Sequence, residues 1–209
     1  MRDHVVALPE GMSQQAEAHL LRADQQEDLC FALYRPGEGR ERWTALLSEL
    51  VLPEDGEREV HGNAAFHSAF IRRALRVAEA AGAGLALMHS HPHGRGWQLM
   101  SKDDINAELG HAAATFAVTK LPLLGLTVAS DRTWSARAWI RDGKGHYQRA
   151  DCSQVRVVGK RLRISYLTPT PTKPLKNQLR TVSFWGEQSH QLFTGLRIAI
   201  VGVGSVGFP

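Results

Sequence analysis

A short apolar run, Leu85–Met88, sets the strongest limit on what this chain can fold into. It follows Gly82 and Gly84, which close a preceding helical pattern, and it leads directly into the His-Ser-His-Pro sequence of residues 89–92. A continuous apolar run bounded in this way is typical of a strand buried on both faces. Proline ends a strand because it cannot donate a hydrogen bond to the ladder. We therefore expect a central strand that ends in two histidines.

The segments around this strand mix helical and extended patterns without strict alternation. Apolar periodicity predicts helices at Ser13–Ala23, His67–Ala81 and Ser101–Ala117, and strands at Leu29–Tyr34, Trp43–Leu52, Leu85–Met88, Leu123–Ser130, Thr133–Arg141 and Val155–Tyr166. Ser13 is the expected N-cap of the first helix. Pro36 and Gly37 are expected to end the first of these strands, and a charged loop is expected from Pro53 to Glu59. This order predicts an α/β fold with a mixed sheet.

Composition excludes several classes of protein. The chain has 209 residues, 43% of them hydrophobic and 22% charged, which excludes a wholly disordered or fibrous chain. The net charge of +4 is spread along the sequence and gives little support to nucleic-acid binding. The longest apolar runs, such as Ile198–Val201, are too short to cross a bilayer and no signal-peptide core is present, so we expect a soluble, cytoplasmic protein without a membrane partner. Cys30 and Cys152 are too far apart for a CxxC site and are expected to be buried or half-buried thiols.

The composition changes abruptly at Thr168–Pro174, where three prolines in six residues indicate a stiff linker. We therefore expect one domain over residues 1–166, a linker over 167–183 and the start of a second domain over 184–209. The last segment holds a predicted strand, Leu196–Val201, followed by a GxGxxG pattern at Gly202–Gly207. Neither the helix nor the acidic residue of a dinucleotide site follows, which excludes a working site of that kind.

Two histidines and an aspartate have the spacing of a metal site. In an extended strand His89 and His91 project to the same side, about 6.6 Å apart along the strand, and Ser101 and Asp104 share one face of the following helix. Asp104 as a third ligand would leave a fourth tetrahedral position open for water, as in catalytic zinc sites. Taken singly, His91 and His93 could be ordinary loop histidines. Ser101 and Asp104 could be an N-cap and its first-turn carboxylate, which stabilise a helix by about 1 kcal/mol.

Taken together, His89-x-His91-Pro92, eight residues, and Ser101-x-x-Asp104 resemble the HxHP…SxxD signature of the JAB/MPN metalloprotease family, also called JAMM. The order of elements fits from about residue 5 to 165. The resemblance implies a curved mixed β-sheet flanked by helices, similar to cytidine deaminase. It also implies a zinc hydrolase, with one Zn²⁺ per chain, that cuts isopeptide or peptide bonds after ubiquitin or a ubiquitin-like protein. In such a site His89, His91 and Asp104 hold the zinc and Ser101 helps to stabilise the oxyanion.

The resemblance further implies a glutamate that acts as general base, located after the first helix and immediately before an apolar strand. Glu27 precedes Leu29–Tyr34 and fits this position. Its competitors lie among glycines or in a charged loop and look solvated: Glu38, Glu54, Glu57 and Glu59. Glu27 would take a proton from the metal-activated water and pass it to the departing lysine amine.

The resemblance and the C-terminal segment suggest related partners. Phe184–Glu187 and Leu196–Gly202 resemble the opening of ThiF-like domains, the adenylating family of ubiquitin-activating enzymes. This implies the protease part of a bacterial JAB–ThiF fusion, cut at the start of the ThiF domain, with that domain in cis and a ubiquitin-like protein or its conjugate as substrate. In the loop His93–Met100, Trp97 is expected to wall a slot for the substrate's diglycine tail. His93 is expected to have no metal role.

Other zinc enzymes fit the sequence less well. A zinc deaminase needs His-x-Glu and Pro-Cys-x-x-Cys, and helix-based zinc proteases need His-Glu-x-x-His, none of which the chain contains. Two alternatives stay open. One is a JAB-type hydrolase that acts on sulfur-carrier proteins or small cysteine adducts. The other is an MPN scaffold without activity, although such scaffolds lack the metal ligands found here.

Overall fold

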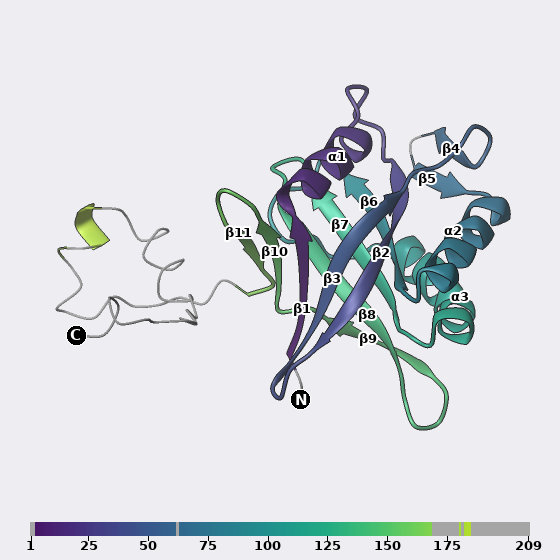
Figure 1. Ribbon diagram of the computed structural model, residues 1–209. Coiled ribbons are helices and arrows are strands. Elements are labelled where there is room, and N and C mark those ends of the chain that lie inside the picture. The colour runs from purple at the N-terminus through teal and green to yellow at the C-terminus, as the bar shows by residue number, and fades with distance from the viewer. Residues whose placement is uncertain (1–2, 62, 169–179, 181, 185–209) are drawn as a thin grey trace. The chain divides into compact units, whose positions relative to one another are not determined.

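The computed structural model describes residues 3–61, 63–168, 180 and 182–184 (Figure 1). The chain divides into two compact units, Met1–Leu167 and Thr168–Pro209. Most of the predicted linker at 167–183, and the predicted strand and glycine pattern at 196–207, lie outside the described residues. The candidate site lies entirely in the first unit.

The described part of the first unit contains three helices and eleven strands. The helices are α1 (Glu10–Leu20), α2 (Ser68–Ala80) and α3 (Lys102–Thr119). The strands are β1 (Asp3–Pro9), β2 (Leu29–Glu38), β3 (Arg42–Val51), β4 (Arg58–His61), β5 (Asn63–Phe66), β6 (Gly84–His91), β7 (Leu123–Ala129), β8 (Trp134–Arg141), β9 (Tyr147–Asp151), β10 (Gln154–Val158) and β11 (Arg163–Tyr166). Nine strands form one sheet in the order β11-β10-β1-β3-β2-β6-β7-β8-β9, and β4 and β5 form a separate hairpin.

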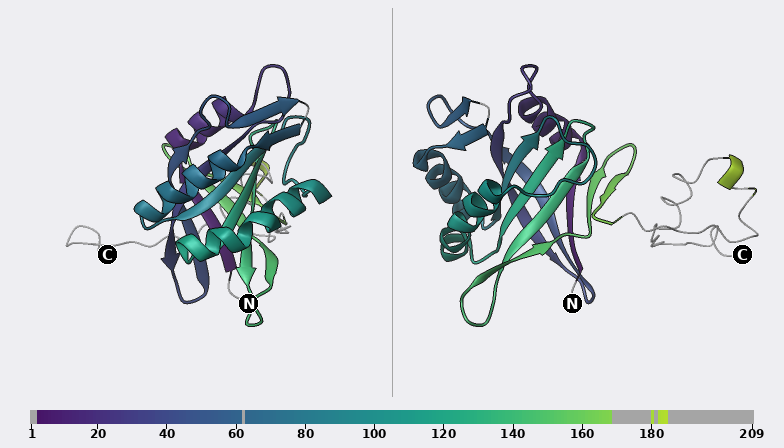
Figure 2. Two further views of the ribbon diagram at one scale, coloured as in Figure 1. Left: turned by 90° about the vertical axis from the view of Figure 1, so that its right-hand side faces the viewer. Right: turned by 180° about the vertical axis from the view of Figure 1, so that it is seen from behind.

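The sheet is mixed and curled, so the predicted α/β class is confirmed. β1 pairs in parallel with β3 and β10, and β6 pairs in parallel with β7, whereas the other pairs in the large sheet are antiparallel. β8 also contacts β1, β10 and β11, which stand far from it in the strand order. α1 packs against β1, β2, β3 and β10, whereas α2 and α3 pack against β6 and β7, so helices flank both faces (Figure 2).

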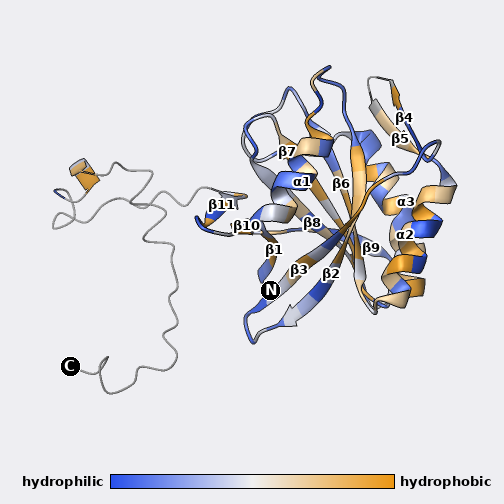
Figure 3. Cartoon of the chain, turned by 45° about the horizontal axis from the view of Figure 1, so that its top comes forward, coloured by the Kyte–Doolittle hydropathy of each residue, from blue (hydrophilic) through white to orange (hydrophobic). Residues whose placement is uncertain are grey.

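The central position predicted for Leu85–Met88 is confirmed, because β6 lies between β2 and β7. Its side chains alternate between two hydrophobic clusters: Leu85 and Leu87 belong to the cluster with α2, and Ala86 and Met88 to the cluster with α1. Hydrophobic residues concentrate in β6 and its neighbouring strands, as Figure 3 shows. Burial on both faces explains why this strand is a continuous apolar run.

The first helix begins earlier than predicted, and the prediction of Ser13 as its N-cap is wrong. α1 starts at Glu10 with Pro9 in the N-cap position. Ser13 lies inside the helix and is fully buried, where its hydroxyl donates to Glu17 Oε1 at 2.7 Å and accepts from Trp134 Nε1 at 3.1 Å. A serine that resembled a cap therefore serves a buried polar contact with a strand 121 positions away.

Three strand predictions need correction. β2 runs through Pro36 and Gly37 to Glu38. Beyond Tyr34 it pairs only with β3, so the N–H that proline lacks has no strand to bond on the other side. The strand predicted at Val155–Tyr166 is two antiparallel strands, β10 and β11. The charged loop after Pro53 leads into the unpredicted hairpin of β4 and β5, and β9 was also missed.

Two further predictions concern the thiols and the membrane. Cys30 and Cys152 are both free and buried, as expected. Burial raises the pKa of Cys30 well above its usual range and that of Cys152 to about 12, so both stay protonated. Within the described residues, none of the helices combines the length and the apolar character needed to span a membrane.

Candidate metal centre

The end of β6 carries His89 and His91 on one face of the sheet and Ser90 on the other. Ser90 is fully buried, and its hydroxyl accepts the backbone N–H of Asp28 at 3.0 Å. His89 is 8% exposed, whereas His91 is half-buried. Side chains alternate between the two faces of a strand, so the structural contact of Ser90 lies on one face and the two convergent imidazoles lie on the other.

Asp104 approaches these imidazoles from the first turn of α3. Ser101 is the N-cap of this helix, and its hydroxyl accepts the backbone N–H of Asp104 at 3.1 Å. In return, Asp104 Oδ2 accepts the backbone N–H of Ser101 at 2.9 Å, which completes a capping box. Ser101 and Asp104 can therefore form a helix cap and also belong to a metal site, because the cap itself fixes the carboxylate that faces β6.

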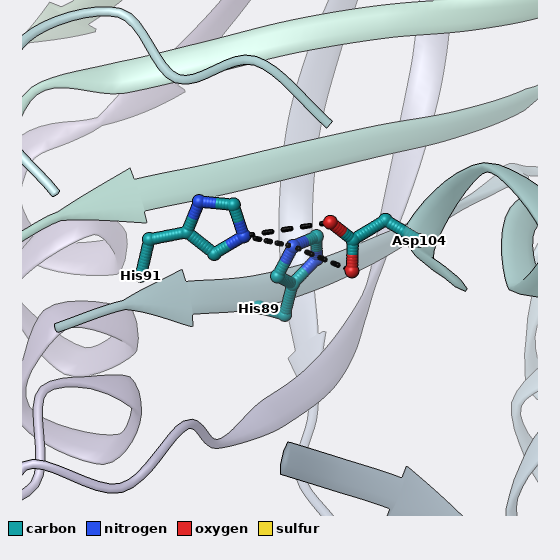
Figure 4. A group of neighbouring side chains, drawn as sticks. All are labelled: His89, His91 and Asp104. Atoms are coloured by element: carbon teal, nitrogen blue, oxygen red, sulfur yellow. Dashed lines mark hydrogen bonds and ion pairs between the residues drawn. The ribbon is translucent and has the colours of Figure 1, made fainter. Parts of the chain in front are cut away.

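His89, His91 and Asp104 point toward one another, as Figure 4 shows. His89 Nε2 lies 3.2 Å from His91 Nε2 and 3.7 Å from Asp104 Oδ1, and His91 Nε2 lies 3.5 Å from Asp104 Oδ2. Ligands bound at about 2.0–2.2 Å in a tetrahedral zinc site stand roughly 3.3–3.6 Å apart. The two distances to Asp104 end on different oxygens, and one donor atom of each residue lies within 4.8 Å of the other two, so the three side chains are close enough to share one cation.

Electrostatics favour the ligand forms of His89 and Asp104. Burial, together with the charge of Arg137, lowers the pKa of His89 to about 3 and keeps the ring neutral. Burial opposes ionisation of Asp104, but hydrogen bonding to His91, the proximity of His89 and the contacts with Ser101 outweigh it and hold its pKa well below its usual range. The hydrogen bond with Asp104 raises the pKa of His91 against the effect of burial. A neutral imidazole and an ionised carboxylate are the states that bind a cation.

Glu27 lies between α1 and β2 and lines the same pocket as His91, Ser101 and Asp104. This pocket has a volume of about 480 Å³. Burial raises the pKa of Glu27, and Asp104 adds to this effect, whereas His91 and His93 oppose it. The glutamate selected from the sequence is therefore a half-buried carboxyl group that faces the candidate ligands.

The competing glutamates lie away from the pocket lining. Glu38 is exposed, and the side chains of Glu54 and Glu59 are 71% and 59% exposed. The expectation that Glu57 is solvated is wrong: it is buried and accepts hydrogen bonds from Arg73 Nε at 2.9 Å and Nη2 at 2.5 Å. A carboxylate held by a guanidinium in this way is a structural partner rather than a base.

The loop between β6 and α3 does not bring Trp97 into the lining of this pocket. Trp97 packs against the core cluster that contains α1, and it lines a separate, smaller pocket with Arg137. The residues of this loop that line the candidate site are Pro92, His93, Gly94, Gln98 and Ser101. His93 is exposed and lies outside the ligand group.

Sequence reasoning missed the polar residues that support the histidines. Thr127 Oγ1 lies 3.3 Å from His89 Nε2 and accepts from Arg137 Nη1 at 2.6 Å. Arg137 is itself ion-paired with the buried Glu108, and Gln98 Oε1 lies 3.3 Å from His91 Nδ1. The polar residues within apolar segments were the available signal, but their contacts span up to 38 positions and follow no short motif.

No family model and no curated protein matches the chain. Among solved structures, the chain is similar to the solution structure of protein DSY2949 from Desulfitobacterium hafniense. The similarity has a TM-score of 0.39 and 13% sequence identity, and it covers 74% of this chain and 95% of that one. A likeness at this level has no bearing on function, so the JAB/MPN resemblance rests on the motif residues of the sequence alone.

Proposed function

We propose that this chain is a metal-dependent hydrolase of the JAB/MPN type: a zinc isopeptidase or peptidase that removes or processes a ubiquitin-like modifier. The observation that carries the proposal is the position of Glu27, which lines one pocket together with His91 and Asp104. A proton-accepting carboxylate beside a three-ligand metal centre is the set of groups that hydrolysis by an activated water requires.

The donor set supports a divalent cation. Two imidazoles and one carboxylate lie close enough to share one cation, His89 is held neutral and Asp104 is held ionised. These donors also suit other first-row cations, and zinc is proposed because three nitrogen and oxygen ligands with one open position are typical of catalytic zinc sites. When bound, zinc supplies Lewis acidity and brings the pKa of a bound water to about 7.

Two side chains near this centre have separate roles in the proposed reaction. Glu27, whose pKa is raised by burial, takes the proton from the water and returns it to the departing amine, a role that contributes about 10²–10⁴-fold to the rate. Ser101 accepts the backbone N–H of Asp104, so its own hydroxyl proton can point into the pocket and donate to the developing oxyanion.

The substrate class rests on the sequence motif. The resemblance of the HxHP…SxxD residues to JAB/MPN proteases favours a ubiquitin-like protein or its conjugate. The resemblance of the C-terminal segment to ThiF-like domains favours a modifier-activating domain on the same polypeptide. A cytoplasmic location belongs to the same proposal.

Metal analysis and a hydrolysis assay test the proposal. Purified protein is expected to hold about one zinc per chain and to cleave a ubiquitin-like conjugate in a reaction that a chelator abolishes and added zinc restores. Glu27→Gln is expected to keep the metal and lose about 10²–10⁴-fold in rate. Glu38→Gln, an exposed glutamate on β2, is the matched control and is expected to keep both.

Each outcome of this assay separates one alternative. A fully active Glu27→Gln variant would mean that another group is the base. Metal binding with hydrolysis of sulfur-carrier proteins or cysteine adducts, but not of ubiquitin-like conjugates, would replace the substrate class alone. Absence of both metal and hydrolysis would favour a non-enzymatic scaffold.

A further inference from the structure

Gln98 contacts His91 at Nδ1, the ring nitrogen that does not face Asp104. Its Oε1 lies 3.3 Å from His91 Nδ1, whereas His91 Nε2 faces Asp104 Oδ2 at 3.5 Å. Gln98 is half-buried in the loop between β6 and α3 and lines the same pocket as His91. One imidazole therefore has a polar neighbour on each of its two nitrogens.

The orientation of the Gln98 amide follows from its other hydrogen bonds. Nε2 of Gln98 donates to the carbonyl oxygen of Arg95 at 2.8 Å and to that of Gly96 at 3.0 Å. A carbonyl oxygen only accepts, so the NH₂ group must face these two backbone atoms and Oε1 must face the ring. Since Oε1 also only accepts, the bond to His91 requires a proton on Nδ1. Asp104 Oδ2 is also only an acceptor, so in the metal-free protein both nitrogens of His91 face acceptors. A metal that replaces the proton on Nε2 leaves the Nδ1–H bonded to Gln98.

The loop that carries Gln98 is hydrogen-bonded to β8 and to the turn between β7 and β8. The backbone N–H and the hydroxyl of Ser130 both donate to the carbonyl oxygen of Gly94, at 3.0 and 2.6 Å. The N–H of Gly96 donates to Asp131 Oδ2 at 2.9 Å, and that of Gln98 donates to Ser135 Oγ at 3.2 Å. These contacts hold the backbone on both sides of the amide, so the acceptor is in place before a metal arrives.

Gly94 shows that the space beside Gln98 is occupied. A Cβ atom at position 94 would overlap the side-chain amide of Gln98, including Oε1. The overlapped atoms are the far end of a flexible side chain, so an alanine at this position would displace the amide rather than the backbone. Gly94→Ala therefore removes the contact with His91 without changing Gln98 itself.

We propose that Gln98 is a positioning residue that accepts the Nδ1–H of His91 and so orients the ring with Nε2 toward the metal. The inference rests on the proposed function, because it assigns a purpose to that orientation. Hydrogen-bond partners of this kind, one shell beyond the metal, typically change metal affinity by about 10–100-fold.

Three variants and one control test the assignment. Gln98→Met keeps the length but removes the acceptor, Gly94→Ala displaces it, and Gln98→Glu keeps an acceptor oxygen for Nδ1. Gln15→Met makes the same change at an exposed position of α1. Zinc affinity, measured by competition with a chelator, is expected to fall about 10–100-fold in the first two variants. It is expected to stay within a few-fold of wild type in Gln98→Glu and in the control.

The Nδ1–H is measured separately in the zinc-loaded protein. Proton–nitrogen correlation spectra of His91 are expected to show an Nδ1–H that is protected from exchange with water in wild type and in Gln98→Glu. Faster exchange of this proton is expected in Gln98→Met and Gly94→Ala. A role limited to loop structure would affect Gln98→Glu as much as Gln98→Met, because both lose the NH₂ group that bonds Arg95 and Gly96.

The outcomes distinguish this inference from the proposed function. Zinc uptake by wild type together with unchanged affinity and unchanged Nδ1–H exchange in Gln98→Met and Gly94→Ala overturns the role of Gln98 alone. Failure of wild type to take up any metal overturns the proposed function, and the inference with it.

Discussion

Two carboxylates lie next to the C-terminal end of β6, and they are neutralised in different ways. Asp28 is 1% exposed. Its two oxygens accept hydrogen bonds from Arg58 Nη1 at 2.8 and 2.9 Å, and Oδ1 also accepts the backbone N–H of Leu29 at 2.7 Å. The partners described for Asp104 are two imidazoles and the backbone N–H of Ser101. Two permanent cations, Arg58 and Arg22, thus balance Asp28, whereas Asp104 faces two imidazoles, of which His89 is held neutral.

This difference separates a structural carboxylate from one that can receive a cation from solution. Asp28 also bonds through its backbone to Ser90, so it ties the start of β2 to the residue between the two candidate ligands. Its ion pair with Arg58 further ties this point to β4. Asp28 therefore stabilises the backbone beside the candidate ligands, whereas Asp104 remains available to a cation.

The largest expected effect is the loss of metal from Asp104→Ala. Removing one of three ligands should reduce the zinc content of metal-resupplied protein from about one per chain to near zero and abolish hydrolysis. Asp103→Ala, in the same helical turn but outside the ligand group, is the control and should retain the metal. Full zinc occupancy in Asp104→Ala, measured by elemental analysis, would refute the contrast between the two aspartates.

A smaller effect is expected at Ser101, the other half of the capping box. Ser101→Ala should retain the metal but lower turnover by about 10²–10³-fold, the usual effect of removing one oxyanion donor. Loss of the cap should also lower the free energy of unfolding by about 1 kcal/mol. Ser101→Thr keeps the hydroxyl and should preserve both properties. Unchanged turnover in the alanine variant would limit Ser101 to a helix cap.

Asp28→Asn should show the opposite pattern from Asp104→Ala. It weakens a charge-assisted contact with Arg58 that is buried on the aspartate side, so the free energy of unfolding should fall by about 2 kcal/mol. The folded variant should still bind zinc, because its ligands are unchanged. Denaturant unfolding followed by metal analysis of the same sample checks both points. A stable protein that has lost its zinc would show that Asp28 belongs to the metal site itself.

Much of this arrangement could be predicted from the sequence because it depends on local patterns. β6, α2 and α3 follow apolar periodicity: the helix expected at 67–81 is found at Ser68–Ala80, and that expected at 101–117 at Lys102–Thr119. The spacing of His89 and His91 on a strand, and of Ser101 and Asp104 on a helix, fixes which side chains share a face. The candidate metal-ligand cluster then requires only that this strand face and this helix face lie against each other.

What the sequence could not predict depends on contacts between distant residues. All side chains of β9 are exposed or half-buried, and it has no apolar pattern because it is paired on one side only, with β8. The hairpin of β4 and β5 follows a charged segment, and one of its charges, Arg58, pairs with Asp28 thirty positions earlier. Gln98 was overlooked because its role depends on the path of a loop, which has no periodicity.

The smallest expected effect concerns a third carboxylate, Glu57, which like Asp28 is balanced by an arginine. Its hydrogen bonds with Arg73 lower the pKa of Glu57, so the pair adds stability above the unfolded pKa of about 4.3 and loses it as the pH falls through the lower folded value. Arg73→Met should therefore lower the free energy of unfolding by at most about 1 kcal/mol at pH 7, and the difference from wild type should shrink near pH 3. Arg72→Met, on the exposed face of α2, is the control. A difference that stays constant from pH 7 to pH 3 in urea unfolding would mean that Arg73 acts through packing, and the contrast would then rest on Asp28 and Asp104 alone.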